Sequence, residues 1–159
     1  MPVSVSVYNQ AASVFAQGLV NSSGSITQTE EKDNLAVALY TAATFTATDT
    51  SMLALTGPPT EAPANGTYVQ FASGQTALSN ITVTQTGNDA TIDADDYTVT
   101  AGASPLSAVA AILYRKQTTV DAVDRPLLFI NFDATETAAA GTDFKIVWSG
   151  SGIFSFVVT

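Results

Sequence analysis

Alternation of apolar and polar residues along most of the chain predicts a series of short β-strands. Residues 3–7 read Val-Ser-Val-Ser-Val, and residues 80–85 alternate through Ile81 and Val83. A period of two places every second side chain on the same face of a strand. Further strands are predicted from residue type and flanking turns at residues 67–73, 90–92, 96–100, 125–133, 142–150 and 152–159.

Two near-continuous apolar runs predict strands that are buried on both faces. In residues 35–41 the larger Leu, Val and Leu alternate with the small Ala36 and Ala38, so the large side chains share one face. Residues 107–116 have the length of a helix as well, but β-branched residues such as Val109 favour a strand.

Helices are predicted only in the first 60 residues. Apolar side chains at positions 8, 12, 15 and 19 lie on one helical face, and the polar stretch 21–34 ends that helix. A second short helix is predicted at residues 48–57. Thr48, Asp49 or Thr50 would cap its start, and Gly57 with the two prolines that follow would end it.

The order of these segments favours an antiparallel fold. Residues 86–89 predict a turn, and Ser149-Gly150-Ser151-Gly152 predicts a tight hairpin between the last two strands. Strict alternation of strand and helix is absent, so a parallel doubly wound sheet is not expected. We predict a mainly β, antiparallel sandwich or barrel-like fold with Greek-key or jelly-roll crossings. We predict a single domain, 1–159, with residues 1–7 as a short strand or an extended N-terminal arm.

The amino-acid composition excludes several kinds of catalytic and metal-binding site. The chain has no Cys and no His, which removes thiolate nucleophiles, the commonest general base and most transition-metal sites. We therefore expect no enzymatic activity, no cofactor and no resident metal.

Because acidic residues outnumber basic ones, negatively charged binding partners are not expected for this chain. Only 12% of the residues are charged and the net charge is −9, so nucleic acid and anionic membranes are not expected to bind. No apolar run approaches the roughly 20 residues that span a bilayer, and the first residues lack the basic start of a secretory signal. A soluble protein made in the cytoplasm is the expectation.

Three carboxylates in four positions form the densest acidic cluster beside a predicted strand: Asp93, Asp95 and Asp96. Alternate acids begin a calcium loop, but the glycine and the bidentate glutamate that complete such a loop do not follow. The alternative, which we favour, is a turn in which the carboxylates accept backbone hydrogen bonds.

Two other groups of residues can be interpreted either as a functional site or as an ordinary part of the surface. A glycosidase needs only two carboxylates, and the candidates are Asp93, Asp96, Asp121, Asp124, Asp133 and Glu136, but nothing singles out a pair. Arg115 and Lys116 end a strand just before acidic residues, which is typical of a solvated, compensated edge; the alternative is an intermolecular contact.

The order of the motifs resembles that of small virion structural proteins of tailed bacteriophages. The matching stretches are "YNQAASVFAQGLVN", "DNLAVALYTAATFTATDT", "TIDADDYTVTAGASPLSAVAAILYRK", "RPLLFINFD" and "IVWSGSGIF". The match is one of pattern and order over most of the chain, and "GPPTEAPANG" departs from it.

The resemblance implies a capsid decoration, or cement, protein that binds the lattice of the major capsid protein on the outside of the virion. It also implies a homo-oligomer, with a trimer favoured, made in the host bacterial cytoplasm. Two alternatives stay open: a neck or tail adaptor, and a carbohydrate-binding module. The second would present exposed aromatic side chains, with Tyr68, Tyr97 and Trp148 as candidates.

Overall fold

The computed structural model describes residues 3–11, 35–57, 59–73, 77–86, 89–116 and 124–156. Within these residues the protein is mainly β, and every strand pairing is antiparallel, as the sequence predicts. The strands are β1 (Ser4–Val7), β2 (Leu35–Ala42), β3 (Thr60–Glu61), β4 (Thr82–Thr86), β5 (Asp89–Asp93), β6 (Tyr97–Thr100), β7 (Leu106–Arg115), β8 (Arg125–Ala138), β9 (Asp143–Ile146) and β10 (Phe154–Phe156).

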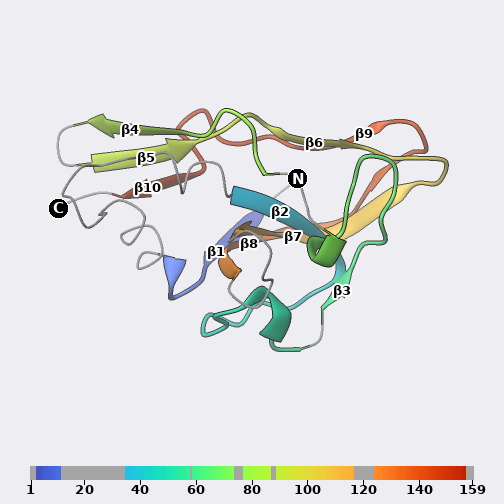
Figure 1. Cartoon of the computed structure of the whole chain (residues 1–159), viewed down its shortest axis with the longest axis horizontal. Coiled ribbons are helices and arrows are strands. Elements are labelled where there is room, and N and C mark those ends of the chain that lie inside the picture. Colours follow the sequence, from blue (N-terminus) through green and yellow to red (C-terminus); the bar gives the residue numbers. More distant parts are fainter. Residues whose placement is uncertain are drawn as a thin grey trace.

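A five-stranded sheet in the order β1-β8-β7-β2-β3 forms the middle of the molecule (Figure 1). Its central strands come from the two apolar runs, and the predicted strand at 107–116 is confirmed as β7. In β2, the larger residues Leu35, Val37 and Leu39 face one hydrophobic core, while Ala36 and Ala38 face another, as predicted.

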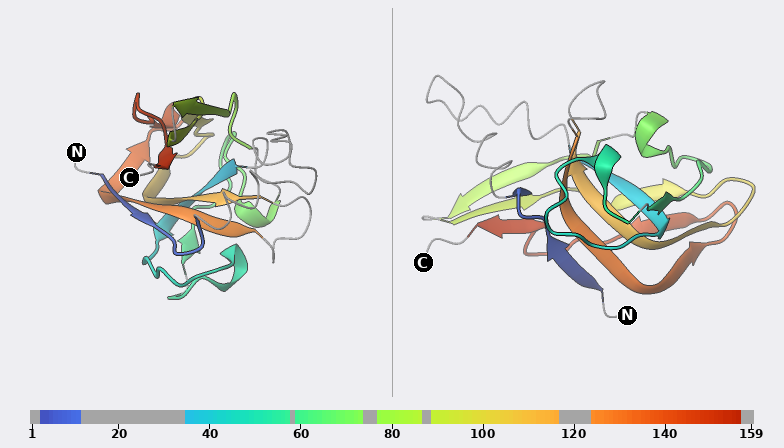
Figure 2. Two further views of the ribbon diagram at one scale, coloured as in Figure 1. Left: turned by 90° about the vertical axis from the view of Figure 1, so that its left-hand side faces the viewer. Right: turned by 90° about the horizontal axis from the view of Figure 1, so that it is seen from below.

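The first core lies on the side of this sheet where the two smaller sheets, β10-β5-β4 and β6-β9, are found. Figure 2 shows β4, β5 and β10 extending to one side of the five-stranded sheet. Ile92 of β5, Val99 of β6 and Phe144 of β9 join Leu113 of β7 and Ile130 of β8 in this core. Removing these side chains from water is the main stabilising contribution of the layer.

The second core covers the opposite face of the five-stranded sheet. It contains Tyr8, Tyr114 and Phe129, with Phe45 and Phe71 arriving from the connections that follow β2 and β3. Aromatic rings meet at centroid distances of 5.0 Å for Tyr8–Phe45 and 5.4 Å for Phe71–Tyr114, both edge-to-face. Such pairs add about 1 kcal/mol each beyond their buried area.

The predicted strand at 67–73 is wrong. Tyr68 makes only an isolated bridge with Asn65, and Phe71–Ser73 form a 3-10 helix. The reason is tertiary: Glu61 Oε1 accepts hydrogen bonds from the Phe71 N–H at 2.6 Å and from the Tyr68 hydroxyl at 2.8 Å. These bonds turn the backbone out of an extended conformation.

Neither of the two predicted helices is found in the described residues. Nearly all of the first, beyond Ala11, lies outside the described residues. At the second, the described residues contain a 3-10 helix of three residues, Met52–Ala54, capped by Ser51. Asp49 does not cap it, because its carboxylate accepts hydrogen bonds from the N–H and the hydroxyl of Thr56, at 3.0 and 2.6 Å.

The tight turn predicted at residues 149–152 is confirmed, since the Gly152 N–H donates to the Ser149 carbonyl at 2.8 Å, but the predicted hairpin pairing of the flanking strands is wrong. β9 pairs with β6, and β10 pairs with β5, so this segment carries the chain from one small sheet to the other. Gly152 has φ +95°, and a Cβ there would lie 2.4 Å from Thr91 Cγ2 and 2.9 Å from the Ile92 carbonyl oxygen. The glycine is required by this close crossing.

Candidate interaction surface

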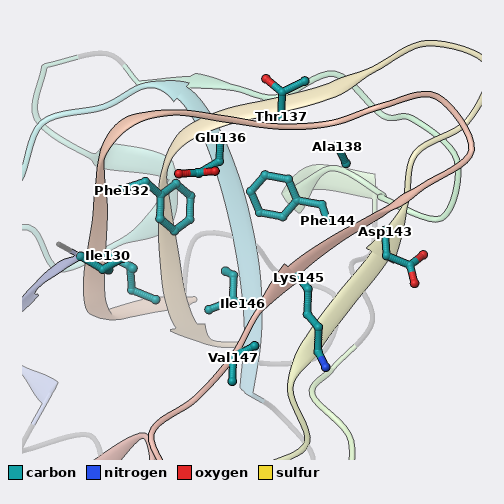
Figure 3. A pocket seen from close by; sticks show the side chains of 11 residues that line it. Ile130, Phe132, Glu136, Thr137, Ala138, Asp143, Phe144, Lys145, Ile146 and Val147 are labelled. Atoms are coloured by element: carbon teal, nitrogen blue, oxygen red, sulfur yellow. The ribbon is translucent and has the colours of Figure 1, made fainter. Parts of the chain in front are cut away.

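A trough lined by apolar and charged side chains runs between β8 and β9 on the first-core side of the molecule (Figure 3). It consists of two cavities of about 500 and 170 Å³, and both are lined by Val3, Ile130, Ile146 and Val147. The side chains of Phe132, Glu136, Phe144 and Ile146 project into the space between the two strands (Figure 3). Trp148, Gly152 and Ile153 line the smaller cavity.

The trough arises where β8 bends. Ala110 of β7 lies opposite Asn131, whereas Ala108 lies opposite Glu136, so β8 has extra residues that oppose nothing in β7. Within this bulge Asp133 has φ +59°. Asn131 donates to the Asp133 carboxylate at 3.0 Å and accepts from the Asp133 N–H at 3.1 Å, which stabilises the left-handed turn.

The walls of the trough are free strand edges. Among the described residues, β1 pairs with β8 only as far as Asn131, and no strand continues along that side of β8 to Ala138. Within the part of the chain that the structure describes, β9 pairs only with β6. All residues from Asp143 to Val147 line the larger cavity. Successive side chains of a strand point to opposite faces, so a cavity that touches every residue in turn lies along the backbone edge of β9.

Three charged side chains line the larger cavity: Glu136, Asp143 and Lys145. Glu136 Oε1 is excluded from solvent and has no hydrogen-bond partner among the described residues. Asp143 accepts a hydrogen bond from the Thr100 hydroxyl at 2.7 Å. Lys145 pairs with Asp96 at 2.9 Å, so its charge is already compensated.

The valine row, Val3, Val5 and Val7, extends from the same trough, which Val3, Val5 and the separate Val147 line. Val3, Val5 and Val7 are 50%, 55% and 47% exposed, and Val147 is 67% exposed. Val5 lies opposite Ile130 in the β1–β8 register, so the valine row is on the first-core face. In the described structure β1 pairs with its own chain, and the outer edge of β1 has no partner strand among the described residues.

The acidic cluster at residues 93–96 forms the connection between β5 and β6. Asp93 accepts from the Ala94 N–H at 2.9 Å, and Asp95 accepts from the Asn80 side chain at 2.7 Å. Asp96 accepts from the Trp148 N–H at 3.1 Å and pairs with Lys145, and both groups lower the pKa of its carboxyl. Each carboxylate thus has a different partner and a role in the local geometry.

The described residues contain no group of three His, Cys, Asp or Glu side chains that could hold a metal ion. Of the other acidic candidates, Asp121 lies outside the described residues, Asp124 is buried, and Asp133 belongs to the β8 bulge. Among the described residues, no helix has the length and apolar character that spanning a bilayer requires.

The three aromatic candidates for sugar binding are not an exposed platform. Tyr68 is buried in the first core, and its hydroxyl accepts from the Leu39 N–H at 3.0 Å. Tyr97 and Trp148 are half-buried against the same core, and the Trp148 indole donates to the Asp95 carbonyl at 2.9 Å. These contacts fix the rings within the fold.

Sequence reasoning found one component of this surface and missed the other. The alternating valines of residues 3–7 are visible in the sequence. The trough is not, because it depends on the register of β8 against β7 and on the separation of β8 from β9. The sequence around Glu136 and Asp143 therefore does not indicate that both residues line the same cavity.

Comparisons with protein-family models, with curated proteins and with solved structures give no match for this chain.

Proposed function

We propose that this protein is a non-enzymatic structural protein of a tailed-phage virion that decorates the capsid by binding the lattice of the major capsid protein. The proposal is supported by the order of sequence motifs that resembles small virion proteins. The mainly β, antiparallel architecture is compatible with it. We further infer that the five-stranded sheet and the two smaller sheets form a sandwich with the first core as its filling.

The observation that carries the proposal is the uncharged valine row at the edge of the five-stranded sheet. Natural edge strands usually carry charges, prolines or coverings that prevent further pairing. β1 instead presents Ser and Val, with Val3, Val5 and Val7 about half exposed. An exposed apolar strip of this kind is typical of a surface that another molecule covers.

Binding to the assembled lattice gives such a protein its stabilising effect. A protein that binds only assembled coat subunits shifts the equilibrium towards the assembled shell by mass action. This mechanism needs a complementary surface and no catalytic groups.

The valine row provides the test. Replacing Val3, Val5 and Val7 together with Thr keeps the β-branched shape and the β1 strand, but makes the row polar. We expect the triple variant to fold with an unchanged melting temperature and to lose at least tenfold of its occupancy on purified capsids lacking the native protein. Occupancy is measured by co-sedimentation and quantitative gel analysis.

The matched control is Leu53→Thr, which changes an exposed apolar residue, 59% exposed, on the 3-10 helix Met52–Ala54. This variant should occupy capsids like the wild type. Equal occupancy by the triple variant and the wild type would contradict a role for the row, and absence of wild-type binding would contradict the proposed function.

A further inference from the structure

We propose that the β8–β9 trough binds an extended segment of the partner protein as an added β-strand, and that a basic side chain of that segment meets Glu136. This inference deepens the proposed function, on which the identity of the partner as a capsid protein rests. The strand-binding chemistry itself is argued from the trough alone.

The shape of the walls favours an extended occupant. Side chains form the floor of the trough, but its sides are the backbone edges of β8 beyond Asn131 and of β9, which have no partner strand on this side among the described residues. The edge of β9, and the edge of β8 after the bulge at Asp133, offer N–H and C=O groups at the spacing of a strand. An extended peptide satisfies these groups by β-augmentation.

The floor of the trough is made of apolar side chains. Ile130, Phe132 and Ile146 are largely buried in the first core, and they also line the trough. An added strand directs every second side chain towards such a floor, and the others towards solvent. The occupant is therefore expected to alternate apolar and polar residues.

The charged side chains of the trough favour a basic occupant. Glu136 Oε1 is buried and has no hydrogen-bond partner among the described residues. Burying a carboxylate oxygen without a partner lowers the stability of the fold. Asp143 adds a second negative charge, and Lys145 is already paired with Asp96. A lysine or arginine of the occupant would form an ion pair with the Glu136 carboxylate through the part of the side chain that lines the trough.

A second copy of this chain fits this site less well than a different protein. The chain carries a net charge of −9 and has only five basic residues. The segments with alternating valines, such as β1, contain no lysine or arginine. A basic segment of another protein is complementary to the trough, and self-association is an outcome that the test distinguishes.

The test uses the isolated full chain and a synthetic nine-residue peptide in which valine and threonine alternate, with lysine at the centre and both ends blocked. Trp148 is the single tryptophan and lines the trough, so its fluorescence reports binding. We expect saturable binding of the lysine peptide and at least tenfold weaker binding of the same peptide with glutamate at the centre. A peptide N-methylated at alternate residues should not bind, because it cannot form the strand hydrogen bonds.

The variants separate the trough from bulk charge. Glu136→Lys should weaken binding of the lysine peptide at least tenfold, and Glu136→Gln should weaken it less. The control is Asp89→Lys, which changes the net charge by the same amount as Glu136→Lys. Asp89 lies on β5 and does not line the trough, so this variant should bind the peptide like the wild type. Unchanged melting temperatures establish that the variants are folded.

Several outcomes would overturn the inference. They are failure of every peptide to bind, equal binding of the N-methylated peptide, and equal effects of Glu136→Lys and Asp89→Lys. A wild-type dimer that Glu136→Lys dissociates would make a second copy the occupant and would also overturn it. Each of these results leaves the protein's presence in virions untouched, whereas absence from virions would sink the proposed function without affecting peptide binding.

Discussion

At the residue scale, Glu61 shows how one carboxylate determines a local conformation that the sequence pattern misses. Its Oε1 accepts hydrogen bonds from the Tyr68 hydroxyl and the Phe71 N–H. The valine and aromatic residues at 67–73 predict a strand, but these two bonds favour a 3-10 helix at Phe71–Ser73. The local pattern could not reveal them, because it does not bring Glu61 to this segment.

Burial raises the pKa of the Glu61 carboxyl above its ordinary value, although its two hydrogen bonds act in the opposite direction. The folded protein therefore binds this proton more tightly than the unfolded chain. The contribution to stability is fully present below the ordinary glutamate pKa of about 4.3 and is lost as pH rises through the folded pKa. Glu61→Gln keeps an acceptor oxygen and removes the ionisation.

We expect the free energy of unfolding of Glu61→Gln, relative to wild type, to increase as pH rises from about 4 to 7. Urea unfolding followed by Trp148 fluorescence measures this difference. Asp96→Asn is the control of opposite sign, because Lys145 and the Trp148 N–H lower the pKa of Asp96. Its deficit relative to wild type should shrink as pH falls through the aspartate range. A pH-independent difference for Glu61→Gln would contradict the assigned burial.

At the element scale, the success of the sequence predictions follows from how local each signal is. The apolar runs of β2 and β7 specify strands by themselves, and the structure confirms both with their two-faced burial. Strand pairing is not local. The glycines at 150 and 152 suggest a hairpin, yet the structure pairs β9 with β6 and β10 with β5.

The bulge in β8 is the element-scale feature on which the trough depends. Asp133 adopts φ +59°, a region in which a residue with a branched Cβ is strained. We expect Asp133→Val to lower the free energy of unfolding by about 1–2 kcal/mol more than Asp133→Gly does. Asp133→Asn, which can keep the hydrogen bonds with Asn131, should be close to wild type.

Chemical denaturation of the three variants at one pH gives the comparison. Equal stability of Asp133→Val and Asp133→Asn would mean that β8 does not require a left-handed residue at this position. The bulge, and with it the separation of β8 from β9, would then need another explanation.

At the scale of the whole molecule, the described residues combine a well-packed pair of cores with a surface that is apolar along one edge. The cores explain how the chain folds without disulfides. The valine row and the trough lie together, since Val3 belongs to both. This continuity is what links the decoration proposal to a specific mode of binding.

The most direct measurement of the central claim is the copy number of this protein in purified phage particles, relative to the major capsid protein, by quantitative mass spectrometry with labelled standards. A decoration protein is expected at roughly one copy for every one to three coat subunits, because it repeats with the symmetry of the shell. A handful of copies per particle would place the protein at the neck or tail instead. Absence from particles would contradict the account.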